Sequence, residues 1–337
     1  MSTGLFACRM GSTLWLELHN PPVNFLTADL CAELHRAFVA AEDDPGIRSI
    51  VLTGKQPGCY IFHFSIPELQ AIAGDNRRLG LHWLIRTRPG RWLVEAGAGL
   101  SLRLMRASRR LEALLLGAAR ALRGYSGTAY LWLQMMAAYQ AIERSSKVTI
   151  AAINGTCNGG GTEMAACFDF RFMVGDAGYT IGQPEVLVGI VAGGGGTQRW
   201  PRLIGTERAL QFLLGCEQWS PQQARAMGVI SEQFPAAEFE TRVQAFAEQF
   251  GRRSACAVQQ TKDAIRRGRQ HSLERGLGIE MAASLVCANE PSTQQVLASY
   301  AGILQREVLD TDPPAQIPQV MDKVLSDAVT QPFAAGG

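Results

Sequence analysis

The sequence predicts an α/β fold, and three observations carry that prediction. Short runs rich in β-branched residues alternate with segments whose apolar residues recur at helical spacing. Glycine-bearing turns separate the two kinds of segment, as in sheets whose strands are joined by helices. With 47% apolar and 18% charged residues among 337, the composition is globular, which excludes disordered and collagen-like classes.

The first strand is expected at residues 15–18, where Trp15 and Leu16 begin an apolar run that Pro21 and Pro22 end. Thr27 is a suitable N-cap for the helix that follows. Apolar residues recur along that helix at positions 30, 34, 38 and 39 until Pro45 and Gly46.

Three further strands are expected at residues 47–52, 148–153 and 170–174, because each run is short, apolar and rich in Val and Ile or Phe. Residues 154–161 form a glycine-rich turn after the second of them. Helices are expected over 207–228 and 238–267, the latter stopped by Gly268, and over 274–309 with a break near Pro291. The Gln/Pro/Ala/Gly-rich remainder is expected to be an irregular tail with one short helix.

The formal charge of +2 hides an uneven distribution. Residues 76–127 hold eleven arginines, no lysine and two glutamates, a net +9, so the rest of the chain carries −7. We call residues 76–127 the arginine-rich segment. Within it, residues 101–123 are predicted to form one basic amphipathic helix with Leu104, Leu111, Leu115, Ala118 and Leu122 on its apolar face. Such a helix covers part of a core, closes over an anionic ligand, or contacts a membrane surface or partner.

The cysteine pattern, the apolar runs and the charge balance indicate the cellular compartment and exclude one class of partner. Eight scattered cysteines without a C-x-x-C pair indicate reduced thiols, and neither a signal peptide nor an apolar run of membrane-spanning length is evident. We therefore expect a cytoplasmic protein. The near balance of 32 basic and 30 acidic residues argues against a dedicated nucleic-acid binder.

The densest chemical signal is the run from Lys147 to Glu163, in which a buried strand leads into three consecutive glycines and then to a glutamate in a first helical turn. A second glutamate, Glu185, precedes another glycine run at 193–196. Two carboxyls in one glycine-lined cleft can divide acid and base roles. The alternative is that Glu163 only favours its helix dipole and Glu185 is a loop carboxylate. The first glycine-rich turn does not fit a dinucleotide or P-loop fingerprint.

These segments resemble the crotonase superfamily, the enoyl-CoA hydratase/isomerase family. The resemblance is carried, in order, by LELHNPPVN (16–24), IVLTG (50–54), AAINGTCNGGGTE (151–163), GQPE (182–185), GGTQR (195–199) and SPQQARAMGVI (220–230). It implies a spiral of β-β-α units over residues 1–255 and a C-terminal helical trimerisation region over 256–310, before a tail at 311–337. Residues 76–130 would interrupt the spiral as an arginine-rich helical insertion.

The resemblance also implies an activity, the addition of water across the α,β double bond of a 2-enoyl-CoA in fatty acid metabolism. Glu163 would act as base toward the water, and Glu185 would deliver the proton to Cα. Backbone N–H groups of Gly160 and of the 60–66 loop, most simply Phe62, would hold the thioester oxygen, and Gly193 would help hold the water. No cofactor is implied beyond the coenzyme A of the substrate, and the expected assembly is a homotrimer or a dimer of trimers.

The chain departs from the family pattern in two places. Phe62, His63 and Phe64 are bulky where the family loop is small, and Ser65 replaces an acid, so His63 and Phe64 are expected to line the substrate site or to pack as structural residues. A C-terminal basic-aromatic motif for the CoA phosphates is not evident, and arginines of the arginine-rich segment are expected to take over that role. An isomerase, hydrolase or decarboxylase of the same fold stays open, as does a non-catalytic acyl-CoA or partner-binding protein. A membrane- or RNA-associating role of the arginine-rich segment is a further alternative.

Overall fold

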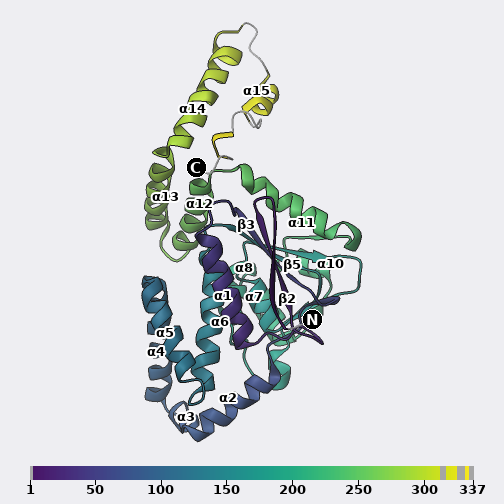
Figure 1. The fold of residues 1–337 in the computed structure, drawn as a ribbon, viewed down its shortest axis with the longest axis vertical. Helices are drawn as coiled ribbons and strands as arrows, with labels where there is room; N and C mark the ends of the chain where they lie inside the picture. Colours follow the sequence, from purple (N-terminus) through teal and green to yellow (C-terminus); the bar gives the residue numbers. More distant parts are fainter. Residues whose placement is uncertain (1–2, 312–315, 325–330, 334–337) are drawn as a thin grey trace.

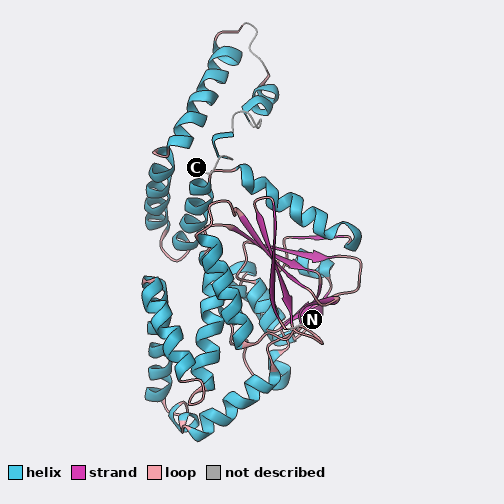
Figure 2. Cartoon of the chain, in the orientation of Figure 1, coloured by secondary structure: helices cyan, strands magenta, loops and turns pink. Residues whose placement is uncertain are grey.

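The computed structural model describes residues 3–311, 316–324 and 331–333. Its strands lie together in one half of the molecule and its helices surround them (Figure 2). The strands are β1 (Gly4–Met10), β2 (Thr13–His19), β3 (Ser49–Gly54), β4 (Gly58–Ile61), β5 (Val148–Ile153), β6 (Gly155–Asn158), β7 (Phe170–Val174), β8 (Ile181–Gly182), β9 (Gln218–Trp219) and β10 (Glu232–Phe234).

The helices are of ordinary α type, apart from four short turns. The α-helices are α1 (Ala28–Glu42), α2 (Ile66–Arg78), α3 (Leu81–Leu84), α4 (Arg88–Ala107), α5 (Arg109–Ala121), α6 (Gly127–Arg144), α7 (Gly160–Ala165), α8 (Gly196–Ile204), α9 (Thr206–Gly215), α10 (Pro221–Ala226), α11 (Phe239–Glu248), α12 (Ala255–Gly268), α13 (Leu273–Ala288), α14 (Pro291–Leu304) and α15 (Ile317–Val324). The short turns are η1 (Glu185–Val188), η2 (Ala236–Glu238), η3 (Gln249–Arg252) and η4 (Gln305–Leu309).

The described strands form two sheets, and from β3 to β8 consecutive strands alternate between them. The larger sheet has the order β1-β2-β3-β5-β7-β10 and the smaller the order β4-β6-β8-β9. Thus β3, β5 and β7 each pass to a partner in the smaller sheet, namely β4, β6 and β8, before the next helix or turn. Pairing is parallel except at β1–β2 and β8–β9. This repetition is the spiral of β-β-α units that the resemblance implies.

The central strands β3, β5 and β7 of the larger sheet are buried on both faces, which explains why they are largely apolar runs. Along β3, Ile50 and Leu52 join the core under α1 and α6, whereas Val51 faces the opposite side. There it packs in a second core with residues of α11, including Val243. Figure 1 shows α1 and α6 on one side of the sheet and α11 on the other.

Several sequence predictions are confirmed. The strands expected at 148–153 and 170–174 coincide with β5 and β7, and the one at 47–52 begins two residues late as β3. Thr27 caps α1, since its hydroxyl accepts the Leu30 N–H at 3.1 Å. The helix α12 ends at Gly268, and the break between α13 and α14 falls at residues 289–290.

Other predictions are wrong, and the errors concern short elements. The stretch 207–228 is interrupted by β9, and the stretch 238–267 is interrupted by η3. β4 and β6 lie within segments expected to be a loop and a turn, and β1 was not expected. Each of β4 and β6 has four residues with no apolar periodicity of its own, so pairing with neighbouring strands makes it a strand. Of the tail at 311–337, residues 312–315, 325–330 and 334–337 lie outside the described residues, and α15 occupies part of the rest.

The single helix predicted over 101–123 is two helices. Ser108 has an extended backbone (φ −161°, ψ 133°), and its hydroxyl accepts the Arg110 N–H at 3.1 Å, so α5 starts afresh at this residue. The helices α4 and α5 therefore fold back on each other, beside α6 (Figure 1). Leu111 and Leu122, predicted on the apolar face, are 37% and 55% exposed, whereas Met105 and Leu116 are buried against α6.

The C-terminal helices extend away from the sheets. Lys262 and Arg266 of α12 pair with the two carboxylate oxygens of Asp169, at 2.5 and 2.7 Å, which anchors α12 beside β7. From there α13 and α14 run outward (Figure 1). Within the described ranges, no helix combines the length and the apolar character needed to cross a membrane.

Candidate active site

Glu163 is placed by a strand, a tight turn and a short helix. β6 ends at Asn158, Gly159 turns the chain with φ of +52°, and α7 begins at Gly160. The left-handed backbone at Gly159 favours glycine. A side chain there would also lie 3.1 Å from a carboxylate oxygen of Glu185. Glu163 follows in the first turn of α7 and is only 3% exposed.

The second glycine run closes over the Glu163 carboxyl. The Gly196 N–H donates to its Oε1 at 2.8 Å. A Cβ at Gly194 would lie 2.7 Å from Oε2, and one at Gly196 would lie 3.1 Å from Oε1. The glycines at these two positions therefore leave the room that the carboxyl occupies.

Glu185 begins η1, and its carboxyl is held by an ordered amide. Gln183 Nε2 lies 3.1 Å from each carboxylate oxygen of Glu185 and 3.2 Å from the Gly159 carbonyl. Its other end, Oε1, accepts the indole N–H of the buried Trp200 at 2.9 Å. Because an indole only donates, this bond fixes which end of the amide faces Glu185.

Burial shifts both carboxyls toward the protonated form. Burial raises the pKa of Glu163 to about 8, the Gly196 N–H opposes that shift, and the charge of Glu185 adds to it. Burial also raises the pKa of Glu185. The structure therefore brings the two predicted glutamates into one site, where the charge of Glu185 raises the pKa of Glu163 and burial raises both pKa values. Carboxyls with raised pKa values are suited to acid–base work.

The backbone around Gly160 offers N–H donors beside this pair. Phe64 packs against Gly160, so that a Cβ on Gly160 would lie 3.3 Å from Phe64 Cβ and 3.5 Å from its amide nitrogen. Within the described residues, the N–H groups of Gly160 and Phe64 have no hydrogen-bond acceptor. The Phe62 N–H instead donates to the Asn24 carbonyl at 3.3 Å. Phe62, the predicted donor in this loop, is therefore already bound to Asn24. The amide that lies beside Gly160 belongs to Phe64, two residues further along the chain.

The remaining predicted site residues lie at the edge of this arrangement. His63 packs between Phe25 and Phe62, with ring centroids at 4.8 and 4.7 Å, and its Nδ1 lies 2.7 Å from the Phe64 carbonyl. Gly193 is exposed in the loop before α8, and it is Gly194 and Gly196, not Gly193, that touch the Glu163 carboxyl.

Two residues that the sequence did not single out, Tyr139 and Arg199, bind backbone carbonyls of the two glycine runs. The buried Tyr139 of α6 donates its hydroxyl to the Gly160 carbonyl at 2.8 Å. Arg199 binds the Gly194 carbonyl at 2.6 Å, pairs with Glu143 at 2.5 Å and lies over the Tyr139 ring. Arg199 belongs to the GGTQR motif and could have been singled out on that ground, whereas nothing local marks Tyr139.

A cavity of about 360 Å³ adjoins Glu185. Its wall is mostly apolar and comes from η1, the loop before α8, and the helices α8 and α9. The residues around it include Val186, Val191, Ala192, Leu210 and Leu213. The 60–66 loop and the arginine-rich segment do not line this cavity.

Fold and site together define an α/β protein with a buried carboxyl pair on two glycine-rich turns. A family model for enoyl-CoA hydratase/isomerase matches residues 118–306, more than half of the chain. The chain belongs to the enoyl-CoA hydratase/isomerase family.

Individual relatives agree with this assignment. A crotonyl-CoA hydratase of Syntrophomonas wolfei is 28% identical over 265 residues, which are 79% of this chain and 82% of that protein. A peroxisomal Delta(3,5)-Delta(2,4)-dienoyl-CoA isomerase of Arabidopsis thaliana is 38% identical over 144 residues, 42% of this chain and only about half (51%) of that protein. The fold is also that of a solved enoyl-CoA hydratase structure from Geobacillus kaustophilus, with a TM-score of 0.69 at 24% identity, covering 90% of this chain and 95% of that one.

Proposed function

We propose that this protein is an enoyl-CoA hydratase that adds water to the α,β double bond of a 2-enoyl-CoA thioester. The observation that carries the proposal is the buried pair of Glu163 and Glu185, whose pKa values are both raised. Hydration needs one group to take a proton from water and another to give a proton to carbon. Two carboxyls in one site, both with raised pKa values, can hold the proton that this reaction requires.

In the proposed reaction, ionised Glu163 takes a proton from water while the water oxygen bonds to Cβ. The electrons of the double bond move toward the thioester, whose oxygen gains negative charge. Protonated Glu185 then gives its proton to Cα as the carbonyl reforms. One proton has moved onto Glu163 and one has left Glu185, so the pair returns to its starting state by exchange of one proton.

The thioester oxygen needs donors placed before the reaction begins. We assign this role to the N–H groups of Gly160 and Phe64 rather than Phe62. The support is that the first two lie side by side without acceptors among the described residues, whereas Phe62 donates to Asn24. Gly160 also stands at the N-terminus of α7, where the helix leaves its first N–H groups free.

We propose that the apolar cavity beside Glu185 takes the acyl group. Its volume of about 360 Å³ falls in the range of small-ligand pockets. Because Glu185 lines it, a chain bound there would have its reacting carbons close to this carboxyl.

The test is hydration of crotonyl-CoA by Glu163→Gln and Glu185→Gln. Each variant keeps the shape of the side chain but cannot exchange a proton, and we expect kcat to fall by about 100- to 10,000-fold. Glu207→Gln is the matched control, since Glu207 is also a first-turn glutamate, on α9, but is exposed. Unchanged turnover in either site variant would reject the assignment.

The pH dependence separates the roles of the two glutamates. With a pKa of about 8, Glu163 acts as a base only in the fraction that is ionised, so kcat/KM is expected to rise with pH until about 8. A profile that falls over this range would make Glu163 the acid and Glu185 the base.

A second candidate reaction is double-bond isomerisation, which the likeness to the Arabidopsis isomerase favours. A 3-enoyl-CoA substrate distinguishes it from hydration, because isomerisation consumes this substrate without adding water. If neither thioester reacts but CoA esters bind, the bulky Phe62 and Phe64 block productive binding and the protein is a non-catalytic family member.

We also propose that the chain assembles as a homotrimer or a dimer of trimers through its C-terminal helices. In support, α13 exposes Leu273 and Met281 by 73% and 60%, and a groove of about 760 Å³ runs between α12 and α13. Light scattering after gel filtration measures the assembly. Leu273→Asp is expected to give monomers, and a monomeric wild-type protein would contradict the proposal.

A further inference from the structure

The corner between α3 and α4 exposes large apolar side chains among arginines. Trp83 and Trp92 are 65% and 64% exposed, and large aliphatic neighbours beside them are between 37% and 54% exposed. We call residues 77–94 the α3–α4 surface; its apolar members are Trp83, Leu84, Ile85, Trp92, Leu93 and Val94. It contains five arginines and no acidic residue: Arg77, Arg78, Arg86, Arg88 and Arg91.

This corner has a defined geometry. Gly90 packs so closely on α3 that a Cβ there would lie 1.8 Å from the Leu84 carbonyl oxygen. Thr87 caps α4 by accepting the Gly90 N–H at 3.1 Å, and its hydroxyl donates to the same Leu84 carbonyl at 2.9 Å. These contacts fix the turn between α3, which carries Trp83, and α4, which carries Trp92.

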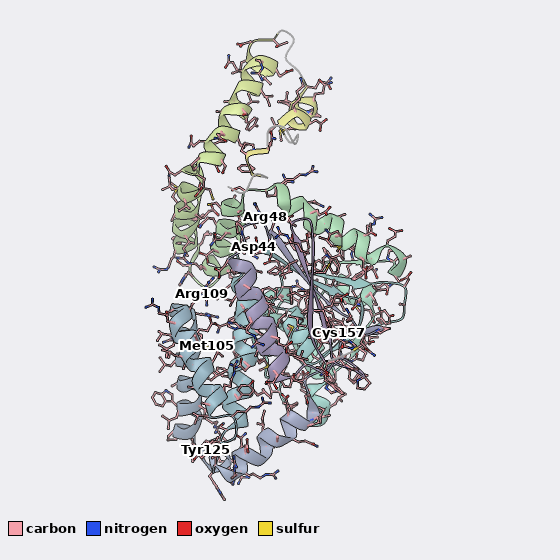
Figure 3. The ribbon with its side chains drawn as sticks, in the orientation of Figure 1. Asp44, Arg48, Met105, Arg109, Tyr125 and Cys157 are labelled. Carbon is pink, nitrogen blue, oxygen red and sulfur yellow. The ribbon has the colours of Figure 1, made fainter. Side chains whose placement is uncertain are left out.

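A third exposed aromatic residue lies at the same end of the molecule. Arg78 donates to the Tyr125 carbonyl at 2.8 Å, which ties the chain before α6 to the end of α2. Tyr125 is 66% exposed, and Figure 3 shows it at the tip formed by α2 and α3.

The arginines of this surface are not all alike: Arg78 pairs with Asp75 at 3.2 Å, whereas Arg88 and Arg91 differ from the paired arginines of the arginine-rich segment. Arg109 and Arg123 pair with Asp43 and Asp29 of α1 and its C-cap, at 2.9 and 3.0 Å, and so hold the segment to the rest of the protein. Across the described part of the chain, Arg88 and Arg91 make no ion pair. Their charge is available to a partner outside the chain.

We propose that the α3–α4 surface docks this protein onto an anionic lipid bilayer, without crossing it. Tryptophan prefers the boundary between lipid chains and headgroups, and arginine binds lipid phosphates there through its forked guanidinium. Aliphatic side chains between them enter the outer part of the acyl layer. A second copy of this chain fits this surface less well, because a symmetric contact would set five arginines against five.

The experiment is flotation of the full-length protein with vesicles of phosphatidylcholine alone and of phosphatidylcholine mixed with phosphatidylglycerol. We expect binding to the mixed vesicles only, with a blue shift of tryptophan fluorescence. Arg88→Gln combined with Arg91→Gln is expected to weaken binding by about 30-fold, which corresponds to about 1 kcal/mol for each arginine at an anionic surface. Trp83→Ala combined with Trp92→Ala is expected to abolish the remaining binding at high salt.

The matched control replaces two exposed arginines elsewhere, Arg208→Gln with Arg275→Gln, and is expected to bind as the wild type does. The proposal is overturned if wild-type protein fails to float with anionic vesicles at low salt, or if the control loses as much binding as the test pair. It is also overturned if the tryptophan variant only abolishes self-association, since the surface would then join copies. A rise in KM for acyl-CoA without any change in vesicle binding would assign Arg88 and Arg91 to the CoA phosphates instead.

Discussion

The carboxyl site and the arginine-rich segment use charge in opposite ways. In the site, two acidic side chains are withdrawn from water, and each is held by a polar group: the Gly196 N–H for Glu163 and the Gln183 amide for Glu185. In the α3–α4 surface, five arginines and two tryptophans face solvent. A buried charge costs free energy unless it is paired, so the first arrangement alters proton affinity. An exposed charge costs little, so the second offers a surface for contact.

This comparison can be tested first at Glu163, where the expected effect on stability is largest. The folded-state pKa of about 8 lies above the ordinary value of 4.5, so the folded protein binds more protons than the unfolded chain between these values. Stability is therefore lost as pH rises through this window. Glu163→Gln removes this titrating group. We expect the free energy of unfolding of the variant to equal that of the wild type below the window and to exceed it by a few kcal/mol above about pH 8.

Urea denaturation at a series of pH values measures this difference. Glu207→Gln, at an exposed first-turn glutamate, should show no such growth. A constant difference between Glu163→Gln and wild type across pH would mean that burial does not control the protonation of this carboxyl.

A smaller effect is expected at the α3–α4 corner. Gly90→Ala places a Cβ against the Leu84 carbonyl, and overpacking of this kind costs about 1–3 kcal/mol. Gly97→Ala, in the same helix with nothing within 4 Å of its Cβ, is expected to gain about 0.5–1 kcal/mol because alanine favours helix. Denaturation and limited proteolysis between α3 and α4 compare the two variants. Equal behaviour would show that the corner is not fixed by this contact.

The smallest effect is expected at Tyr139, a positioning residue behind the proposed oxyanion donors. Tyr139→Phe removes the hydrogen bond to the Gly160 carbonyl and is expected to lower kcat for crotonyl-CoA about 5- to 10-fold with little change in KM, as the loss of about 1 kcal/mol of positioning implies. Tyr130→Phe is the control on the same helix, since its hydroxyl binds Asp29 at 2.6 Å, in contact with Arg123 and away from the site. Equal losses in both variants would indicate a general effect on α6.

Much of the fold was predictable because its signals are local. The β5 and β7 strands are apolar runs buried on both sides, and Thr27 caps α1 three residues from its partner. The break at Ser108 was not predicted, because an apolar stripe at helical spacing continues across it. There the serine cap and packing against α6 outweigh the periodicity.

The sequence by itself determined the two glutamates, the glycine runs beside them and the separation of an acidic body from a basic segment, because each is a pattern within a short stretch of chain. Only the tertiary structure decided that Gly196 donates to Glu163 across 33 residues and that Tyr139 holds Gly160 across 21. It also decided that Phe64 rather than Phe62 faces Gly160 and that Arg109 and Arg123 are paired while Arg88 and Arg91 face outward. The physical reason is that these contacts depend on where the sheet and α6 bring distant segments together, and no local periodicity encodes that placement.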